Sequence, residues 1–295
     1  MYLLDGAEQL SSGLHPSFAD YYPTASTKKS WLTDREAVSN VIELDAREED
    51  EGCIAFLQDS NIISGVSTFV FVSFYNSSDT HLNTTAYTIT TIGGQALTAS
   101  DNNQKLTYLM GYPKNLESWA SATTKPSNNP TWAYYTIKLM DGSLAECSNA
   151  IKINKVCGAV KHENTQLAWT NSVGGWDSVT FTGRTEHSET TKSKPYIKQI
   201  GDWDASTYTF LPQARESVDY QKSAQAKFKL FRLDFSFSEI ALIKYALRSD
   251  NVMIRIADGA WQPVIMDTKS YVIKEAFVGM FSVSLNVTLA QPIKC

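Results

Sequence analysis

The sequence predicts a mainly β protein: two β-sandwich-like domains, the second with one packed α-helix, preceded by an extended N-terminal arm. Aromatic residues make up 12% of the 295 residues and charged residues only 19%. Much of the polar remainder is Ser, Thr and Asn, which suits sheets with hydroxyl-rich outer faces better than helices. Short runs of β-branched and aromatic residues recur between turn-forming clusters. At this length two domains are expected.

Residues 1–60 differ from the rest in composition and periodicity, and we expect them to form an extended arm or linker. The stretch from Ser11 to Lys29 is rich in Ser, Thr, Tyr and Pro and shows no sustained period, which indicates an arm or an ordered loop. Thr33 followed three residues later by Glu36 predicts the start of a short helix. The acidic run from Glu48 to Glu51 is more typical of a solvated turn than of a metal or partner site.

Residues 61–157 are expected to form the first β-sandwich. Turn clusters separate its strands, among them Asn76–Asp79, Gly93-Gly94 and the loop Ser121–Pro130. The β-prone runs predict strands at Thr68–Tyr75, Thr85–Ile92, Lys105–Met110, Thr131–Leu139 and Ala150–Val156.

Residues 158–295 are expected to form a β-sandwich or open barrel with one helix. Lys227–Phe235 alternates charged and apolar residues, which predicts a strand with one wet face, whereas Arg184–Ser193 is polar without a period and predicts a loop. Ser236 and Glu239 form a capping box ahead of a helix to Arg248. Other strands are expected at Leu167–Thr170, Trp176–Phe181, Lys198–Trp203, Val252–Ile256, Pro263–Met266, Tyr271–Ile273 and Phe281–Leu289.

The stretch from Leu167 to Gly183, LAWTNSVGGWDSVTFTG, has the pattern of a β-hairpin that brings two tryptophans close together. Gly174 and Gly175 supply the backbone freedom that a tight turn needs. We expect Trp169 and Trp176 to pack, and Asn171 and Asp177 to hydrogen-bond the backbone of the turn. Hairpin geometry explains the glycines better than phosphate binding, because no GxGxxG or Walker spacing is present.

Candidate chemistry is sparse, and we assign no catalytic residue, cofactor or metal. Asp202 and Asp204 flank Trp203, a combination that fits a sugar-contacting site or a glycoside hydrolase but is more typical of an Asp-rich turn. With the tryptophans, these residues define the alternative function, a carbohydrate-binding adhesin module. His187 lies in a polar stretch without a nearby nucleophile, so we expect an exposed loop histidine.

Charge and cysteine usage exclude several classes of function. The net charge of −5 and the absence of a basic stripe argue against nucleic-acid binding. Of the four cysteines we expect buried free thiols, with a Cys147–Cys157 bridge as the less favoured alternative. No window is apolar enough for a membrane span. The N-terminus lacks a signal-peptide core, so we expect synthesis in a cytoplasm or a leader missing from this chain.

The segment from Ile151 to Gly183 resembles a recurring pattern in structural proteins of tailed bacteriophages that infect Bacteroidetes. In that pattern a cysteine-bearing strand, here with Cys157, precedes a Leu-x-Trp/Phe-x-Asn-x-x-Gly-Gly-Trp/Phe-Asp-x-x-x-Phe hairpin. The matching positions are Leu167, Trp169, Asn171, Gly174, Gly175, Trp176, Asp177 and Phe181. A looser likeness of Ser236–Ala290 is to the carboxy-terminal part of tail and baseplate adaptor proteins.

The resemblance implies a nonenzymatic structural subunit of a virion, in the tail, the baseplate or the head–tail connection. Its partners would be other copies of itself and other virion proteins, with no membrane involved. It would assemble in the host cytoplasm into a homo-oligomeric ring or docking platform, which fits head-to-tail contacts and strand addition at sheet edges.

Overall fold

The computed structural model of the chain is dominated by strands. It describes residues 31–58, 69–88, 105–118, 125–140, 144–156, 163–197, 201–204, 206–209, 217–235, 237–257, 259–268, 281–291 and 293–294. In these ranges the helices are α2 (Pro113–Leu116) and α3 (Phe237–Arg248), with the 3-10 turn η4 (Pro126–Asn128). The prediction of a mainly β fold with one helix in the second half is therefore confirmed. Across the described ranges, no helix is long and apolar enough to cross a membrane.

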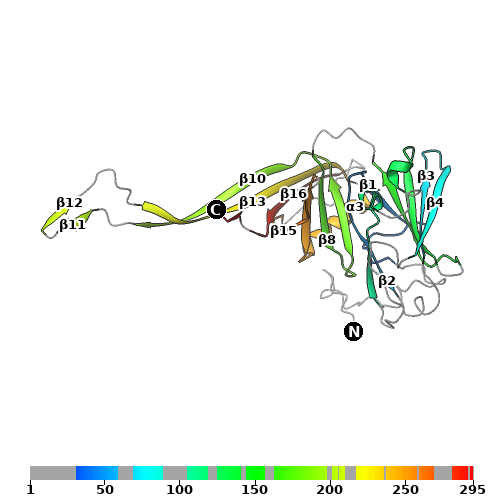
Figure 1. Cartoon of the computed structure of the whole chain (residues 1–295), viewed down its shortest axis with the longest axis horizontal. Coiled ribbons are helices and arrows are strands. Elements are labelled where there is room, and N and C mark those ends of the chain that lie inside the picture. Colours follow the sequence, from blue (N-terminus) through cyan, green and yellow to red (C-terminus); the bar gives the residue numbers. More distant parts are fainter. Residues whose placement is uncertain are drawn as a thin grey trace.

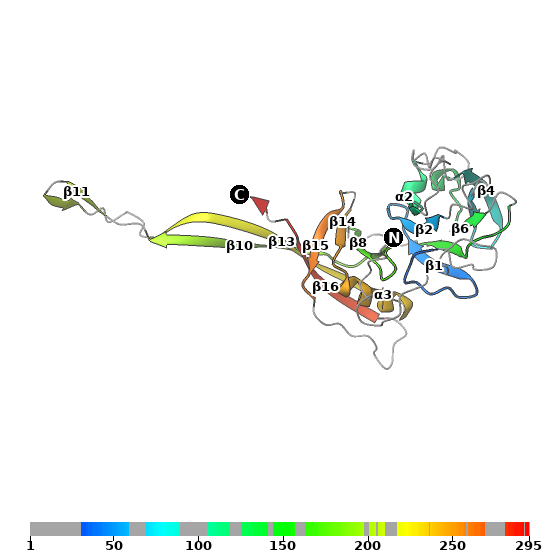
Figure 2. The same ribbon diagram turned by 90° about the horizontal axis from the view of Figure 1, so that it is seen from below.

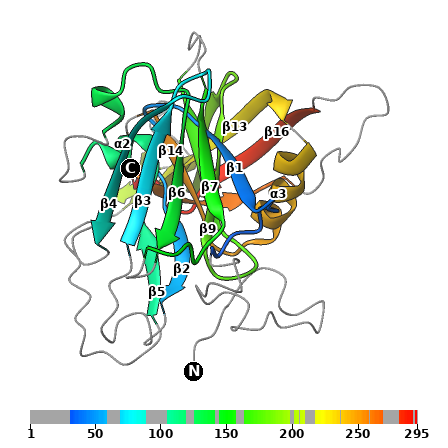
Figure 3. The same ribbon diagram turned by 90° about the vertical axis from the view of Figure 1, so that its right-hand side faces the viewer.

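The first half contains a five-stranded sheet faced by a two-stranded sheet (Figure 3). The strands of the larger sheet, in spatial order, are β1 (Val41–Ala46), β7 (Ala150–Lys155), β6 (Tyr134–Met140), β3 (Phe69–Tyr75) and β4 (His81–Thr88). Only the β1–β7 pair is parallel. The smaller sheet pairs β2 (Ile54–Gln58) with β5 (Lys105–Leu109).

The core of the first half follows from the alternation of its strands. In β3 every second residue is buried, with Val70, Val72 and Phe74 pointing inward. Phe74 packs on Tyr135 at 5.1 Å between ring centroids and edge-on against Trp132 at 6.0 Å. Burial of such aromatic side chains is a large contribution to the stability of a small sandwich.

The second half contains one antiparallel eight-stranded sheet with α3 packed on it (Figures 1 and 2). Its spatial order is β10 (Glu186–Ile197), β13 (Ser217–Phe235), β16 (Phe281–Leu289), β15 (Gln262–Met266), β14 (Val252–Ile256), β8 (Thr165–Thr170) and β9 (Trp176–Phe181), with β17 (Ile293–Lys294) paired to β13. The sheet curls so that the end of β9 meets β13, where the Gly183 N–H donates to the Phe231 carbonyl at 2.9 Å. This arrangement is closer to an open barrel than to two facing sheets.

A two-stranded arm formed by β10 and β13 projects from the body of the molecule (Figures 1 and 2). All twelve residues of β10 are exposed, and the strand spans about 40 Å at the usual rise per residue. Beyond it lies the small hairpin of β11 (Asp202–Asp204) and β12 (Thr207–Thr209). The prediction of a loop at Arg184–Ser193 is wrong, since this segment runs into β10.

The predicted N-terminal arm is corrected for the residues of that range that the structure describes. Trp31 is buried in the first core, β1 pairs with β7, and β2 pairs with β5. Residues 31–58 therefore belong to the body, whereas residues 1–30 lie outside the described part of the chain. The predicted helix after Thr33 is also absent, because residues 32–37 form no helix. The Thr33 hydroxyl accepts a hydrogen bond from the Arg35 N–H at 3.2 Å, which caps a bend instead.

One expectation near α3 needs correction as well, and a second, the capping box, lies partly outside the described residues. Burial alternates along β13 through Arg232 and Leu233, but the residue types do not follow it, because the apolar Leu233 is 65% exposed and the charged Arg232 is buried. Arg232 occupies a core-facing position, where its guanidinium forms an ion pair with Glu239 at 3.0 Å and donates to the Thr180 carbonyl at 3.1 Å. Glu239 is thus a buried partner of Arg232. The other member of the predicted capping box, Ser236, lies outside the described residues.

Candidate functional site

The turn between β8 and β9 is built around the side chain of Asn171. Its Oδ1 accepts hydrogen bonds from the backbone N–H groups of Gly175, at 2.7 Å, and Val173, at 3.2 Å. Its Nδ2 donates to the Leu32 carbonyl at 2.9 Å and to Asp177 Oδ2 at 3.0 Å. Because the side chain is fully buried, all four bonds replace contacts that water would otherwise make. Asn171 therefore bonds the turn backbone, as its place in the sequence of the turn predicts.

The two glycines of the turn serve different purposes. Gly174 has a φ of 84°, which is the left-handed region where a side chain is strained. At position 175 only glycine fits, since a Cβ placed there would lie 2.1 Å from the carbonyl oxygen of Leu32. The second glycine thus lets the segment before β1 press directly onto the hairpin.

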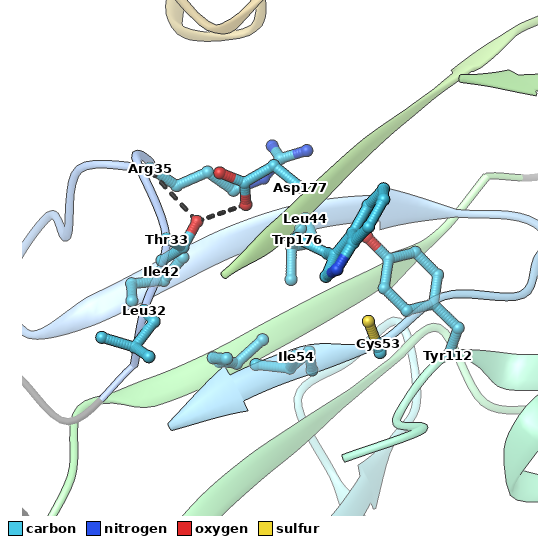
Figure 4. A pocket seen from close by; sticks show the side chains of 11 residues that line it. Leu32, Thr33, Arg35, Ile42, Leu44, Cys53, Ile54, Tyr112, Trp176 and Asp177 are labelled. Carbon is cyan, nitrogen blue, oxygen red and sulfur yellow. Dashed lines mark hydrogen bonds between the residues drawn. The ribbon is translucent and has the colours of Figure 1, made fainter. Parts of the chain in front are cut away.

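Asp177 binds this N-terminal segment and not the turn backbone, which corrects the expectation for its role (Figure 4). Its Oδ1 accepts from the Thr33 hydroxyl at 2.5 Å, and its Oδ2 accepts from the Asp34 N–H at 3.0 Å. The Asp34 carboxylate in turn accepts hydrogen bonds from the Ser172 N–H and hydroxyl. Together with the Leu32 contact, these bonds hold residues 32–34 against the hairpin.

A small cavity lies beside these bonds, between β1, β2 and the start of β9 (Figure 4). Cys53, Tyr112, Leu44 and Trp176 are among the residues that line it. Its open volume is about 10 Å³, near the minimum for one water molecule and far too small for a sugar. Burial, aided by the negative charge of Asp177, raises the pKa of the Cys53 thiol to about 12. This thiol is protonated at neutral pH and is a poor nucleophile.

The two tryptophans of the hairpin lie on opposite faces, which corrects the expectation that they lie together. The register pairs Trp176 with Thr170 and Trp169 with Asp177, and cross-strand partners share a face. Trp169 is fully buried in the second core, and its indole N–H has no hydrogen-bond partner among the described residues. Trp176 is half-buried on the face toward the first half. Both tryptophans pack, but against different neighbours.

The second face of the hairpin is bonded to the first half of the chain. Ser178 donates to the Tyr112 hydroxyl at 2.9 Å. Thr180 donates to the Asp50 carboxylate at 2.8 Å. Asp50 is only 1% exposed, and this burial raises the pKa of its carboxyl while the bonds from Arg47 N–H and Thr180 oppose the rise. The hairpin is therefore buried on both faces.

The acidic run Glu48–Glu51 is part of this contact, so its reading as a solvated turn is wrong for Asp50 and Glu51. Arg255 is 2% exposed, and its guanidinium donates to Glu51 Oε1 at 3.1 Å and to the Glu49 carbonyl at 3.1 Å. Gln166 completes the group by accepting from Arg255 at 2.9 Å and bonding both backbone groups of Glu51. We call this set of contacts, with Asp50–Thr180 and Tyr112–Ser178, the junction.

Asp202, Trp203 and Asp204 lie far from the junction. They form β11, where Trp203 is the register partner of Tyr208 and the aspartates pair with Thr209 and Thr207. The expected turn is therefore a strand of the small hairpin beyond the arm (Figure 1). The structure does not bring these residues together with Trp176, and β11 and β12 pair only with each other among the described strands.

Other candidates give no chemical site. His187 is exposed in β10 and stacks on Phe228 at 4.6 Å, so it is a strand residue and not a loop residue. Cys53 and Cys147 are free thiols, as expected, whereas Cys157 and Cys295 lie outside the described residues. A search of the described ranges finds no group of three or more His, Cys, Asp or Glu residues that could hold a metal ion.

No protein-family model matches the chain, and a search of curated proteins finds no match. The function is therefore inferred from the geometry of the described residues.

Sequence reasoning missed most of the junction. The contact of Asp50 in the junction, and those of Thr33 and Asp34 beside it, carry no local signal, because the hairpin residues that they bind are more than a hundred positions away. Arg255 does have a signal: it interrupts the apolar strand VMIRI, and a charged residue in such a place is rarely buried without a partner.

Proposed function

We propose that this chain is a structural subunit of a tailed-phage virion, in the tail, the baseplate or the head–tail connection. Copies of the chain would assemble into a ring or docking platform together with other virion proteins. The proposal rests on the resemblance of Leu167–Phe181 to the phage hairpin pattern and on the architecture of the arm. The arm is the observation that contributes most.

A two-stranded ribbon that projects into solvent is unusual for a protein that acts alone. Isolated hairpins are marginally stable in water, and β10 is an edge strand whose outer backbone groups have no partner strand among the described elements. Exposed edges of this kind are templates for strand addition by another chain. Large apolar side chains on the arm, Tyr196 at 45% and Ile197 at 79% exposure, add surface that a partner would cover.

The junction between the two halves of the chain supports the same proposal independently of the arm. Buried charges and hydrogen bonds, rather than a flexible linker, join the two halves. A rigid body transmits the position of its arm to its neighbours, which a regular ring requires. The geometry at Cys53 and the size of the neighbouring cavity favour this mechanical role over catalysis.

Mass spectrometry and cryo-electron microscopy of purified phage particles that encode the chain test the proposal. We expect the chain in every particle at a fixed copy number, in density with rotational symmetry. A chain that is made during infection but absent from purified particles contradicts the proposal.

A further inference from the structure

One face of the arm is basic. Lys192 and Lys194 are two residues apart in β10, and the register places Lys227 opposite Ser188 and Lys229 opposite Glu186. Because cross-strand partners share a face and alternate residues along a strand do the same, all four lysines point the same way. They are exposed and extend over about 27 Å of the ribbon. Glu186 is the only carboxylate on this face up to Lys194. The four lysines and this glutamate give the face a net charge of +3.

The opposite face of the arm is different. Ala224, Ala226 and Phe228 on that face of β13 are at most 7% exposed. The basic face is therefore turned away from the core of its own chain. Within the described part of the chain none of its four lysines forms an ion pair.

An acidic strip lies at the other end of the molecule, along β1 and the turns that flank it. Burial alternates in β1 so that Glu43 and Asp45 point outward. The strip consists of the exposed residues Glu36, Glu43, Asp45, Glu48 and Glu49. Lys152 pairs with Glu43 at 3.3 Å and Lys155 with Glu48 at 2.5 Å. With the half-buried Arg35, whose charge acts on Asp45, this leaves a net charge of −2. Figure 3, seen from the end opposite the arm, shows β1 on this side.

We propose that the basic face of the arm docks on the acidic strip of a second copy of this chain. The charges of the two surfaces are complementary in sign. The chain as a whole carries −5, so everything outside the basic face carries −8, and a second copy offers the arm an attractive field. Opposite charge across an interface fixes the register and speeds association.

The placement of the two surfaces defines the kind of assembly. Since the arm and the strip lie at opposite ends of one molecule (Figures 1 and 3), the contact joins different surfaces of two copies. Such head-to-tail contacts produce closed rings when the rotation between copies closes. This inference rests on the proposed function and names the partner of the arm.

Charge reversal tests the proposal in the full chain. The arm variant combines Lys192→Glu with Lys194→Glu, the strip variant combines Glu36→Lys with Glu49→Lys, and the swapped variant has all four changes. Lys222→Glu, on the other face of the same arm, is the control for a charge change outside the basic face, and it also removes the exposed ion pair of Lys222 with Asp219. Sedimentation velocity between 1 and 100 µM, on the order of the Kd of a weak interface, measures self-association, and circular dichroism verifies folding.

We expect the arm and strip variants each to weaken self-association by about tenfold or more, the swapped variant to regain most of it, and the control to stay within about twofold. Raising the salt concentration should weaken the wild-type association. A wild-type chain that stays monomeric, an arm variant that associates normally, or a swapped variant that is not rescued overturns the proposal.

Fluorescence anisotropy with a labelled DNA duplex tests the competing occupant. The proposal is also overturned, in favour of nucleic acid, if the wild-type chain binds the duplex, the arm variant does not, and the self-association of the arm variant is unchanged. The proposed function fails separately, through absence of the chain from virions, whereas the docking contact can fail in a chain that is present in every particle.

Discussion

At the scale of single residues, Asn171 is the part of the turn that no other side chain can imitate. It needs an acceptor toward Gly175 and Val173 and a donor toward Leu32 and Asp177 at the same time. Aspartate has the same shape, but its carboxylate would face the Leu32 carbonyl and the Asp177 carboxylate without a donor. The amide therefore specifies which segment lies on the hairpin, because buried polar groups must be satisfied.

Gly175→Ala should destabilise the chain by about 3 kcal/mol or more, because the new Cβ would lie 2.1 Å from the Leu32 carbonyl oxygen and would force the backbone there to shift. Gly174→Ala is the matched control. It introduces only a positive-φ penalty, which is about 1–2 kcal/mol. Urea unfolding of both variants measures the difference. Equal losses would show that the contact with Leu32 does not determine the choice of glycine at position 175.

Tyr112 makes the stability sensitive to alkaline pH. Burial raises the pKa of this phenol to about 12, whereas an unfolded tyrosine titrates near pH 10. The stabilisation from the protonated phenol is thus complete below pH 10 and is lost as the pH rises through 12. The loss amounts to at most about 3 kcal/mol.

We therefore expect Tyr112→Phe to cost about 1 kcal/mol at pH 7, where it loses the bond from Ser178. Its unfolding free energy should then fall less than that of the wild type between pH 9 and pH 11.5. Urea unfolding across this range makes the comparison. The Cys53 thiol, whose pKa burial also raises to about 12, is present in both proteins. Parallel curves would mean that Tyr112 does not titrate with unfolding.

At the scale of elements, the β8–β9 hairpin is central because it is shared by both halves of the chain. One face contributes Leu167, Trp169 and Phe181 to the second core. The other contributes Gln166, Ser178 and Thr180 to the junction. Burial on both faces explains why these strands do not show the alternation of apolar and polar residues that is typical of a sheet with one solvent-exposed face.

Arg255→Met should destabilise the chain by about 1–3 kcal/mol, since it removes the buried hydrogen bonds of the guanidinium to the Glu49 carbonyl, Gln166 and Glu51. Glu51 is half-buried and keeps its ion pair with Lys114 at 3.1 Å. The exposed ion pair of Lys152 with Glu43 offers a control, and Lys152→Met should cost less than about 1 kcal/mol. Differential scanning calorimetry should also show the Arg255 variant unfolding in two steps as the halves separate. A single transition near the wild-type temperature would contradict a coupling role for Arg255.

How far the sequence predicts these elements depends on whether a strand or helix has one face exposed to solvent and one face buried. The runs at β3, β6 and β9 and the helix α3 were predictable because each has one apolar face or an apolar run with turn signals beside it. The segment of β10 resembles a loop because both of its faces meet water, so nothing imposes a period of two on its composition. The contacts of Asp50 and Arg255 were not predictable, since they depend on which distant strands meet.

At the scale of the whole molecule, the two ends of the long axis differ, with the first half of the chain at one end and the arm at the other (Figure 2). The second core begins at the base of the arm, where Ala226, Phe228 and Leu230 are buried. Residues further along β10 are exposed without exception. The outer part of β10 therefore adds little buried surface to either core, and its surface is open to a partner.

Removal of the outer arm separates folding from assembly. Replacing residues 192–223 by Asn-Gly joins Thr191 to Ala224, which are register partners in the ribbon, through a two-residue loop suited to hairpins. We expect the shortened chain to fold with a midpoint within a few degrees of the wild type, because both cores are retained. In contrast, the rings that we expect the full chain to form in negative-stain electron microscopy should be absent for the shortened chain, and its mass measured by light scattering should be that of one chain. Rings that form without the arm would place the assembly contacts on the body, and a chain that no longer folds would show that β10 and β13 stabilise the monomer.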